Sequence, residues 1–285
     1  MLERIKNGWE LVKRSLSVLK ADKEIVMFPV LSVIFTLMLT GVFIFLVVAG
    51  GLLSLTVSEN LADATVYLIF LAYMIAVYFV SVFFKAAVIT SATIRLNGKN
   101  PSFGDGLKTP ARHILRILVW ALILVAVNII LSMIRGAGKN KSRGIQIGTE
   151  AGAAVAETAW NLLTYFTIPI IIFEELSMWQ SMKKSMQLFK ETWGENITAQ
   201  FSVGGIFFLI FLVALVPFII SILTGVAALM MITFVAMLAV MAIIAVIQSS
   251  VNGILVASLY YYATKGKIPS VFDGGMLNRM FVRKK

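Results

Sequence analysis

The stretch "IVMFPVLSVIFTLMLTGVFIFLVVAGGLL", from Ile25 to Leu53, contains no charged residue. About 20 consecutive apolar residues are enough for a helix to cross the hydrocarbon core of a bilayer, so this longer run predicts a transmembrane helix. The composition of the whole chain agrees, because 59% of its 285 residues are hydrophobic and 14% are charged. Soluble domains have roughly 45–50% apolar and 25% charged residues. The sequence therefore excludes a soluble fold.

Five further apolar stretches follow, so we predict an all-α integral membrane fold with six transmembrane helices. A cleavable signal peptide is not expected, because the first apolar run begins only at Ile25 and no small-residue cleavage pattern follows it. The chain has no cysteine, which excludes disulfides and thiolate metal sites. The predicted spans are 25–53, 64–96, 112–134, 146–173, 197–223 and 226–263.

The distribution of lysine and arginine predicts the direction of the spans. Alternate segments carry six, five, three and six cations, namely 1–24, 95–116, 174–196 and 263–285. The loops 54–63 and 223–231 carry none, so the positive-inside rule places both termini in the cytoplasm. The net charge of +11 does not indicate nucleic acid, because the cations lie in short loops beside apolar spans.

One loop departs from this pattern. "RGAGKNKSRG", from Arg135 to Gly144, places four cations on the outer side. Two interpretations stay open. The loop is either a short basic loop that is translocated, its charge partly offset by Glu150 and Glu157, or an outer-leaflet site for an anionic lipid or polymer.

Two amphipathic stretches repeat one another. "WELVKRSLSVLK", from Trp9 to Lys20, aligns without a gap with "WQSMKKSMQLFK", from Trp179 to Lys190. Apolar residues at helical spacing, with cations on the remaining surface, predict a helix that lies in the membrane interface. Such a helix serves either as a collar that positions the next span or as a site that recognises a specific lipid or partner.

A second pair of stretches repeats at nearly the same distance. "GKNPSFGDG" begins at Gly98 and "GKIPSVFDG" at Gly266, and six of nine positions are identical. The two pairs are offset by 170 and 168 residues, which indicates one duplication. Both copies begin on the inner side, so they are parallel repeats related by an axis along the membrane normal. We predict a single membrane domain, 1–285, in four parts. Repeat A (1–107) contains an interfacial helix and two spans, and the inserted spans three and four follow (108–173). Repeat B (174–277) has the same elements as repeat A, and a basic tail (278–285) ends the chain.

The second repeated motif is interpreted as helix punctuation. Gly98 and Gly266 end the preceding helix in a left-handed conformation, and Lys99 and Lys267 lie near its carbonyl end and the headgroups. Pro101 then prevents the helix from resuming. A phosphate-binding turn is the alternative, although the Walker spacing is lacking.

The stretch "PIIIFEELSMWQSMKKSMQLFKETWG", from Pro169 to Gly194, resembles a pattern in poorly characterised prokaryotic multi-pass membrane proteins. These are related to the membrane domain fused to some glycerophosphodiester phosphodiesterases. This chain has Glu175 where such relatives carry a small residue. The resemblance implies a six-span helical bundle in a prokaryotic cytoplasmic (inner) membrane and no established activity, since the soluble phosphodiesterase domain is lacking. The matching elements are Pro169, Glu174, Ser185, the stretch Leu188–Lys190 and Trp193.

The sequence predicts no enzyme, cofactor or metal site. His113 is the only histidine, which excludes zinc sites and triads that need a second histidine. It follows Thr109 and Pro110, which we expect to start a helix with a basic stripe formed by Lys108, Arg112 and Arg116. Glu174 and Glu175 are expected to cap the second interfacial helix near its positive end.

Two features of the spans concern helix contacts. Gly148, Gly152 and Ala156 are four residues apart and form a small-residue ridge that permits close helix approach, within the chain or in a dimer. Lys85 in the second span either pairs with Glu157 or Asn161, because an isolated intramembrane charge is costly, or meets headgroups where the helix leaves the membrane.

Two classes of function fit these patterns. The first is a non-enzymatic membrane protein that binds anionic lipids, a membrane-protein partner or a second copy, and contributes to envelope organisation. The second is a transporter or lipid exporter with a pathway between the parallel repeats. Sparse intramembrane charge favours the first. The candidate intramembrane polar residues are Lys85, Glu157, Asn161, Gln248 and Asn252, and the candidate headgroup contacts are Lys13, Arg14, Lys99, Arg112, Arg116, Lys183, Lys184 and Lys267.

Overall fold

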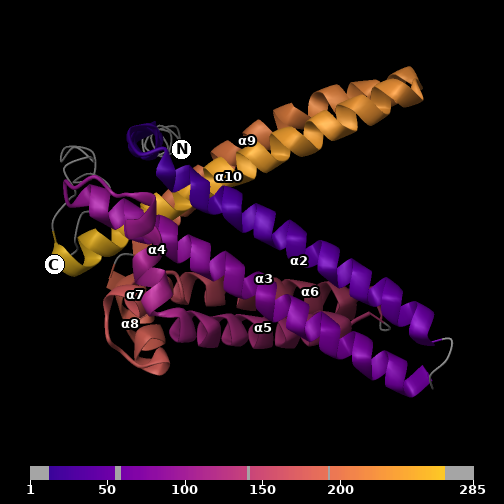
Figure 1. The fold of residues 1–285 in the computed structure, drawn as a ribbon, viewed down its shortest axis with the longest axis horizontal. Coiled ribbons are helices and arrows are strands. Elements are labelled where there is room, and N and C mark those ends of the chain that lie inside the picture. Colours follow the sequence, from indigo (N-terminus) through magenta and orange to yellow (C-terminus); the bar gives the residue numbers. More distant parts are fainter. Residues whose placement is uncertain (1–12, 55–58, 140–141, 192, 267–285) are drawn as a thin grey trace. The chain divides into compact units, whose positions relative to one another are not determined.

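The computed structural model describes residues 13–54, 59–139, 142–191 and 193–266, whose regular structure is all α-helix (Figure 1). The predicted all-α class is confirmed for these residues. A first helix covers residues 13–21. The elements after it are α2 (Glu24–Ser54), α3 (Glu59–Leu96), α4 (Phe103–Arg112), α5 (Ile114–Gly136), α6 (Arg143–Leu163), α7 (Thr167–Phe173), α8 (Met178–Glu191), α9 (Trp193–Thr224) and α10 (Ala227–Lys265).

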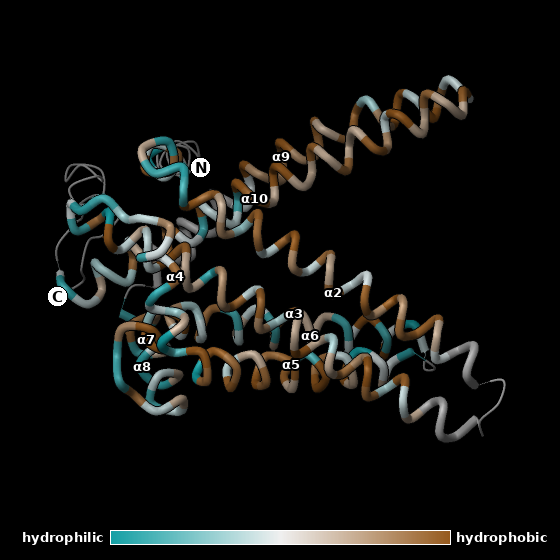
Figure 2. The backbone as a smooth tube through the Cα atoms, viewed as in Figure 1, coloured by the Kyte–Doolittle hydropathy of each residue, from teal (hydrophilic) through white to brown (hydrophobic). Residues whose placement is uncertain are grey.

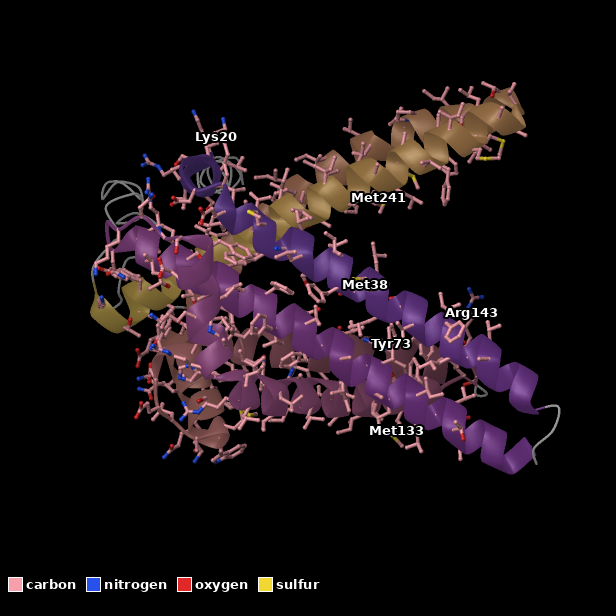
Figure 3. All side chains as sticks on the ribbon, viewed as in Figure 1. Lys20, Met38, Tyr73, Met133, Arg143 and Met241 are labelled. Carbon is pink, nitrogen blue, oxygen red and sulfur yellow. The ribbon has the colours of Figure 1, made fainter. Side chains whose placement is uncertain are left out.

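Six helical segments of the described chain are long and apolar enough to cross a membrane. They overlap the predicted spans one by one, so the predicted number of spans is confirmed there. Figure 2 shows hydrophobic residues along most of α5, whereas hydrophilic residues concentrate in α4 and α8. Met38 on α2 and Met133 on α5, labelled in Figure 3, are 62% and 69% exposed, as expected of side chains that face lipid. The six segments are Glu24–Gly50, Ala64–Leu96, Ile114–Gly136, Arg143–Phe173, Gly204–Thr224 and Ala227–Lys265.

The helices belong to two compact units. The first unit comprises Met1–Pro29, Val88–Gly106 and Lys190–Lys285, and the second comprises Val30–Ala87 and Leu107–Phe189. Within the first unit α9 packs along α10, and within the second unit α5 packs along α6 (Figure 1). The first unit therefore draws its residues from both predicted repeats.

Glycine ends both helices that lead into the repeated motif. Gly98 has a φ of +79°, and its N–H donates to the Arg95 carbonyl at 2.9 Å. The Lys99 N–H donates to the Ile94 carbonyl at 3.2 Å, which completes the two bonds of a Schellman C-cap. Gly266 ends α10 in the same left-handed region, with a φ of +63°. The predicted conformation of both glycines is confirmed.

The remainder of the first motif starts α4. Ser102 Oγ donates to the Asp105 carboxylate at 2.7 Å, and the Asp105 N–H donates to Ser102 Oγ at 3.2 Å, a local variant of the capping box. Gly106 lies so close to Phe28 that a Cβ would approach Phe28 Cε2 to 2.9 Å. These contacts favour punctuation and packing over phosphate binding in the first copy. The second copy beyond Gly266 lies outside the described residues.

In the first unit, α3 and α10 approach each other closely at Gly253. A Cβ at this position would lie 3.1 Å from Val88 Cβ and closer still to Val88 Cγ1. Val88 is β-branched, and such a residue has one strongly preferred rotamer in a helix, so it cannot easily turn away. Ile254 and Ala257 beside Gly253 are fully buried. Glycine is therefore the residue that permits this approach.

The predicted small-residue ridge of α6 makes no comparable contact in the described part of the chain. Gly148, Gly152 and Ala156 are all exposed. A Cβ at Gly148 or Gly152 would meet no atom within 4 Å. Of the two predicted uses of the ridge, an internal contact finds no support among these residues.

Gly253→Ala is expected to lower the melting temperature in mild detergent, because overpacking a close helix contact costs about 1–3 kcal/mol. Gly152→Ala is the matched control in another helix interior. It should leave stability unchanged or raise it by up to about 1 kcal/mol, the difference in helix propensity. Equal melting temperatures for the two variants would contradict the close approach at Gly253.

Candidate functional site

The second interfacial helix, α8, has a protein-facing side and an outward side. Ser181, Ser185, Leu188 and Phe189 are buried and form the protein-facing side. On the outward side Trp179 is 63% exposed, and the Lys183 Nζ atom lies 5.5 Å from its ring centroid, a cation–π contact. An amphipathic aromatic ring beside a cation suits the headgroup layer of a membrane.

Ser185 joins α8 to the break between α6 and α7. Its Oγ donates to the Leu163 carbonyl at 2.8 Å and accepts the Phe166 N–H at 3.0 Å. The break lies within the segment Arg143–Phe173, which is apolar enough to span a membrane. An unpaired backbone group in lipid costs several kcal/mol. Ser185, which is fully buried, therefore makes the interruption of this span tolerable.

The start of α8 is capped by Ser177 and Gln180. The Ser177 N–H donates to Gln180 Oε1 at 3.0 Å, and the Gln180 N–H donates to Ser177 Oγ at 3.4 Å, the reciprocal pattern of a capping box. These capping hydrogen bonds thus come from Ser177 and Gln180, and the role of Glu174 and Glu175 near the positive end of the helix stays a prediction. The carboxylate of Glu174 forms an ion pair with Lys184 Nζ at 2.6 Å.

Glu174 also connects α8 with the beginning of α5. Arg116 Nη1 donates to the backbone carbonyl of Glu174 at 3.0 Å. Arg116 and Lys184 are half-buried, whereas Arg112 and Lys183 are exposed. The predicted headgroup contacts of the second unit thus divide into two cations that hold the protein together and two that face outward.

A helix break at His113 separates α4 from α5. The predicted helix start at Thr109 and Pro110 is wrong, because α4 begins at Phe103 and contains Pro110. The His113 N–H donates to the Pro110 carbonyl, and its Nδ1 atom lies 3.0 Å from the Thr109 carbonyl oxygen. His113 therefore makes a local contact at the break between the two helices.

The other predicted headgroup contacts lie outside α4, α5 and α8. Lys13 and Lys99 are exposed, and Arg14 is half-buried. Lys267 lies outside the described residues. Among the described residues, no group of three or more histidine, cysteine, aspartate or glutamate side chains is placed to hold a metal ion.

Three of the predicted intramembrane polar residues belong to the second unit. Glu157 of α6 forms an ion pair with Arg135 near the end of α5, and this pair takes the place of the predicted pairing with Lys85. Lys85 and Asn161 are exposed. Gln248 and Asn252 lie on α10 in the first unit and are half-buried.

Two residues near Glu157 were not predicted as site residues, namely Tyr78 and Arg135. A side-chain hydrogen bond joins Tyr78 of α3 to Asn128 of α5, and Glu157 acts electrostatically on the Tyr78 hydroxyl. Arg135 was missed because it was assigned to the basic loop. Tyr78 was missed because tyrosine is common in transmembrane helices near the interface. A polar side chain on each of three spans was the signal that could have identified this cluster.

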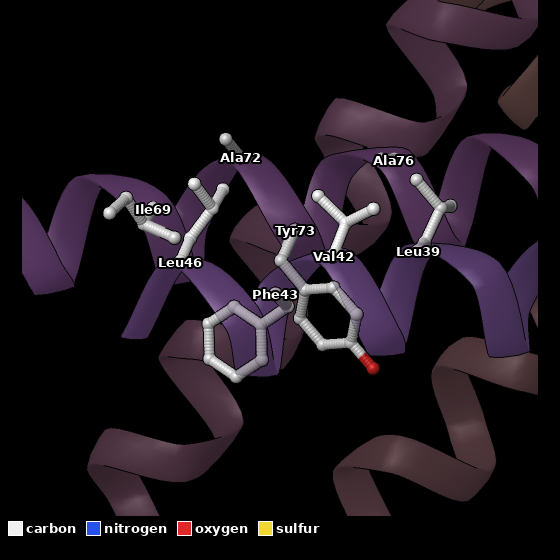
Figure 4. A pocket seen from close by; sticks show the side chains of 8 residues that line it. All are labelled: Leu39, Val42, Phe43, Leu46, Ile69, Ala72, Tyr73 and Ala76. Carbon is white, nitrogen blue, oxygen red and sulfur yellow. The ribbon is translucent and has the colours of Figure 1, made fainter. Parts of the chain in front are cut away.

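An apolar pocket lies between α2 and α3 within the second unit (Figure 4). Its volume is about 240 Å³, larger than an engineered apolar cavity of about 150 Å³ that stays dry and binds benzene. The rings of Phe43 and Tyr73 stack with centroids 4.5 Å apart, and Tyr73 Oη lies 3.0 Å from Thr40 Oγ1. The pocket suits part of an acyl chain. Its lining residues are Leu39, Val42, Phe43, Leu46, Ile69, Ala72, Tyr73 and Ala76.

Asp22 and Arg95 form an ion pair in the first unit, with 3.2 Å between Arg95 Nε and the Asp22 carboxylate. The Asp22 side chain is buried, with 5% of its surface exposed. Burial raises the pKa of Asp22 above its ordinary value of 3.8, and the Arg95 guanidinium only partly opposes this. The ionised carboxylate is therefore less favourable in the folded protein than in water.

The described helices are those of a multi-pass membrane protein with an amphipathic helix, α8, beside its spans. Residues 61–270 match the model of a family described as "Family of unknown function (DUF6159)", and the chain belongs to this family. None of the curated proteins matches the chain. The relationship to the membrane domain of glycerophosphodiester phosphodiesterases stays a prediction.

Ser185→Ala is expected to lower stability in detergent by about 1–3 kcal/mol, because it leaves two backbone groups at the helix break without their partner. Ser181→Ala is the matched control. Ser181 lies on the same face of α8 and is equally buried. Its Oγ donates to the Ser177 carbonyl, four residues earlier in the chain, and so does not join α8 to the helix break. Similar melting temperatures for both variants would contradict the role of Ser185 at the break.

Asp22→Asn is expected to stabilise the protein relative to the wild type at pH 7. Since the folded-state pKa of Asp22 is raised, the folded protein holds this proton more tightly than the unfolded chain. The resulting stability is present in acid and is lost as the pH rises through the raised pKa. Melting temperatures between pH 4 and pH 8 should show the difference shrinking toward acid. A variant that is less stable at pH 7 would mean that the ion pair with Arg95 outweighs burial.

Proposed function

We propose that this protein is a non-enzymatic, multi-pass membrane protein that binds anionic lipids at its inner surface and contributes to envelope organisation. The observation that carries this proposal is the two-sided α8, whose buried serine, leucine and phenylalanine residues face the protein while Trp179 and Lys183 face outward. The same proposal places the chain in a prokaryotic cytoplasmic membrane with both termini in the cytoplasm, as the distribution of cations favours.

The contacts of the cations support a lipid-facing role for a subset of them. Arg116 and Lys184 each bind Glu174, so part of their charge is compensated within the protein. Arg112 and Lys183 are exposed beside them. A basic group near the surface of an anionic membrane contributes about 1 kcal/mol to association, and the outward pair is positioned to make that contribution.

The proposed duplication of repeats A and B rests on a matched pattern of burial. Ser15, Val18 and Leu19 of the first interfacial helix are buried, as are Ser185, Leu188 and Phe189 at the aligned positions. Lys13 and Lys20, and likewise Lys183 and Lys190, are exposed. Two helices that bury the same positions are used in the same way, which supports a common origin.

A contact between equivalent positions gives further support to the duplication. Lys265 Nζ lies 3.4 Å from Asn97 Oδ1, and these residues are 168 apart, the offset of the second motif. In a pseudo-twofold arrangement, residues at the axis meet their own counterparts. Such a contact is expected for parallel repeats.

A transporter or lipid exporter is the second candidate. It is favoured by the polar contacts inside the second unit, where Tyr78 bonds Asn128 and Arg135 pairs with Glu157. Intramembrane ionisable residues often mark ion or substrate pathways. We retain the lipid-binding proposal as the first, because these polar groups are matched in pairs. A membrane-protein partner or a second copy is compatible with either candidate.

Replacing Lys13, Arg112 and Lys183 together by glutamine is expected to weaken binding of phosphatidylglycerol. At about 1 kcal/mol per cation, the loss corresponds to roughly 100-fold in affinity. Native mass spectrometry of protein in mild detergent, titrated with phosphatidylglycerol or phosphatidylcholine, provides the measurement.

The matched control keeps the charge at the same positions, as Lys13→Arg, Arg112→Lys and Lys183→Arg. It should bind phosphatidylglycerol like the wild type. If the glutamine variant also does so, these cations serve only to orient the chain in the membrane, and the proposal fails.

A further inference from the structure

The Arg135 side chain extends in an unusual direction to form its ion pair with Glu157. Two contacts between α5 and α6 show which residues of the two antiparallel helices lie opposite one another. The rings of Trp120 and Trp160 stack with centroids 6.0 Å apart. Near the turn, a Cβ at Gly138 would lie 3.2 Å from Gln146 Cα. Counted from these contacts, Glu157 is level with a point on α5 that lies roughly 10–20 Å before Arg135, at 1.5 Å per residue. The Arg135 side chain therefore runs from the end of α5 back toward its middle.

This direction is opposite to the usual one. A long cationic side chain near the end of a membrane helix normally extends toward the headgroups. Arg135 instead meets the carboxylate of Glu157, which lies farther along α6 from the turn between the two helices. The attraction between the Glu157 carboxylate and the guanidinium holds the Arg135 side chain in this orientation.

The pair lies on the surface of the second unit rather than in its interior. The side chains of Arg135 and Glu157 are 40% and 42% exposed. Both residues lie on segments long and apolar enough to span a membrane, so a Glu157 carboxylate that lost Arg135 would be a costly unpaired intramembrane charge. Arg135 lies one residue before the end of α5, so its side chain can also extend outward, toward the headgroups, where a phosphate would offset this cost.

The outward position would bring Arg135 to other cations. Lys139 follows it in the turn between α5 and α6, and Arg143, labelled in Figure 3, begins α6; both are exposed. Gly138 holds this turn tightly against α6, since a Cβ there would clash with Thr149. Since α5 ends at Gly136 and α6 begins at Arg143, the three cations lie at the same end of this helix pair.

We propose that Arg135, Lys139 and Arg143 form a binding site for a phosphate group, and that Glu157 competes with this phosphate for Arg135. The planar guanidinium binds phosphate through two parallel hydrogen bonds, and the two neighbouring cations add attraction. The phosphate belongs either to a lipid headgroup or to a soluble anion. This inference concerns the end of the second unit opposite to Glu174 and Arg116, and it does not rest on the proposed function.

Glu157→Gln tests the competition directly, because it removes the rival charge and retains the shape of the side chain. We expect it to increase affinity for phosphate at least about fivefold. Arg135→Gln, and the double variant Arg135→Gln with Glu157→Gln, should both lack this gain. Glu150→Gln is the matched control, an exposed glutamate on the same helix, and should bind like the wild type.

Two titrations distinguish the sources of the phosphate. Native mass spectrometry with phosphatidylglycerol reports a lipid headgroup, and thermal shift with inorganic phosphate reports a soluble anion. A gain in Glu157→Gln that depends on Arg135 in either titration supports the site. Equal affinity of Glu157→Gln and the wild type in both titrations overturns it.

Two further variants protect the test from indirect effects. Arg135→Lys keeps the charge and loses the planar fork, so it should retain part of the gain if Arg135→Gln does not fold. The variant in which Lys13, Arg112 and Lys183 are replaced by glutamine should leave the gain from Glu157→Gln unchanged. Failure of the inner-surface proposal and failure of this site would therefore be seen separately.

Discussion

The need to pair every backbone N–H and C=O group inside a membrane governs much of this structure. A continuous helix satisfies the requirement by itself, and each place where a helix stops needs a local solution. At Gly98 a Schellman cap pairs the last carbonyls, and at Ser102 a capping box starts α4. At the break between α6 and α7 the solution comes from another helix, through Ser185. The conspicuous motifs of the sequence are therefore located where helices end.

This constraint changes how the resemblance to prokaryotic multi-pass membrane proteins is understood. Its motif contains Glu174 and Ser185, residues of kinds that carry catalysis in many enzymes. In the structure Ser185 bonds backbone groups, while Glu174 binds Lys184 and, through its carbonyl, Arg116. Both residues fasten α8 to the spans. In this chain, the two residues of the pattern therefore contribute to the assembly of the helices.

The sequence predicted the class, the number of spans and the ends of the long helices, because these depend on local properties. Hydrophobic length defined the spans, and Gly98 and Gly266 marked two helix ends. Contacts between distant residues were predicted less well. Glu157 was one of two candidate partners for Lys85, with a headgroup contact as the alternative, whereas Arg135 reaches Glu157 along the α5–α6 hairpin. Depth along a helix does not determine which face a side chain occupies, nor in which direction a long side chain extends.

The proposed duplication places Lys85 and Gly253 at equivalent positions, 168 residues apart. In the second copy glycine is needed, since α10 approaches Val88 there. In the first copy the same position carries a long cation, so it cannot form the same close contact. The helix that carries Lys85 has acquired different neighbours, because Tyr78, two turns earlier, bonds Asn128 in the inserted spans. If the proposed duplication is right, the two copies diverged at the point where the inserted spans contact the first of them.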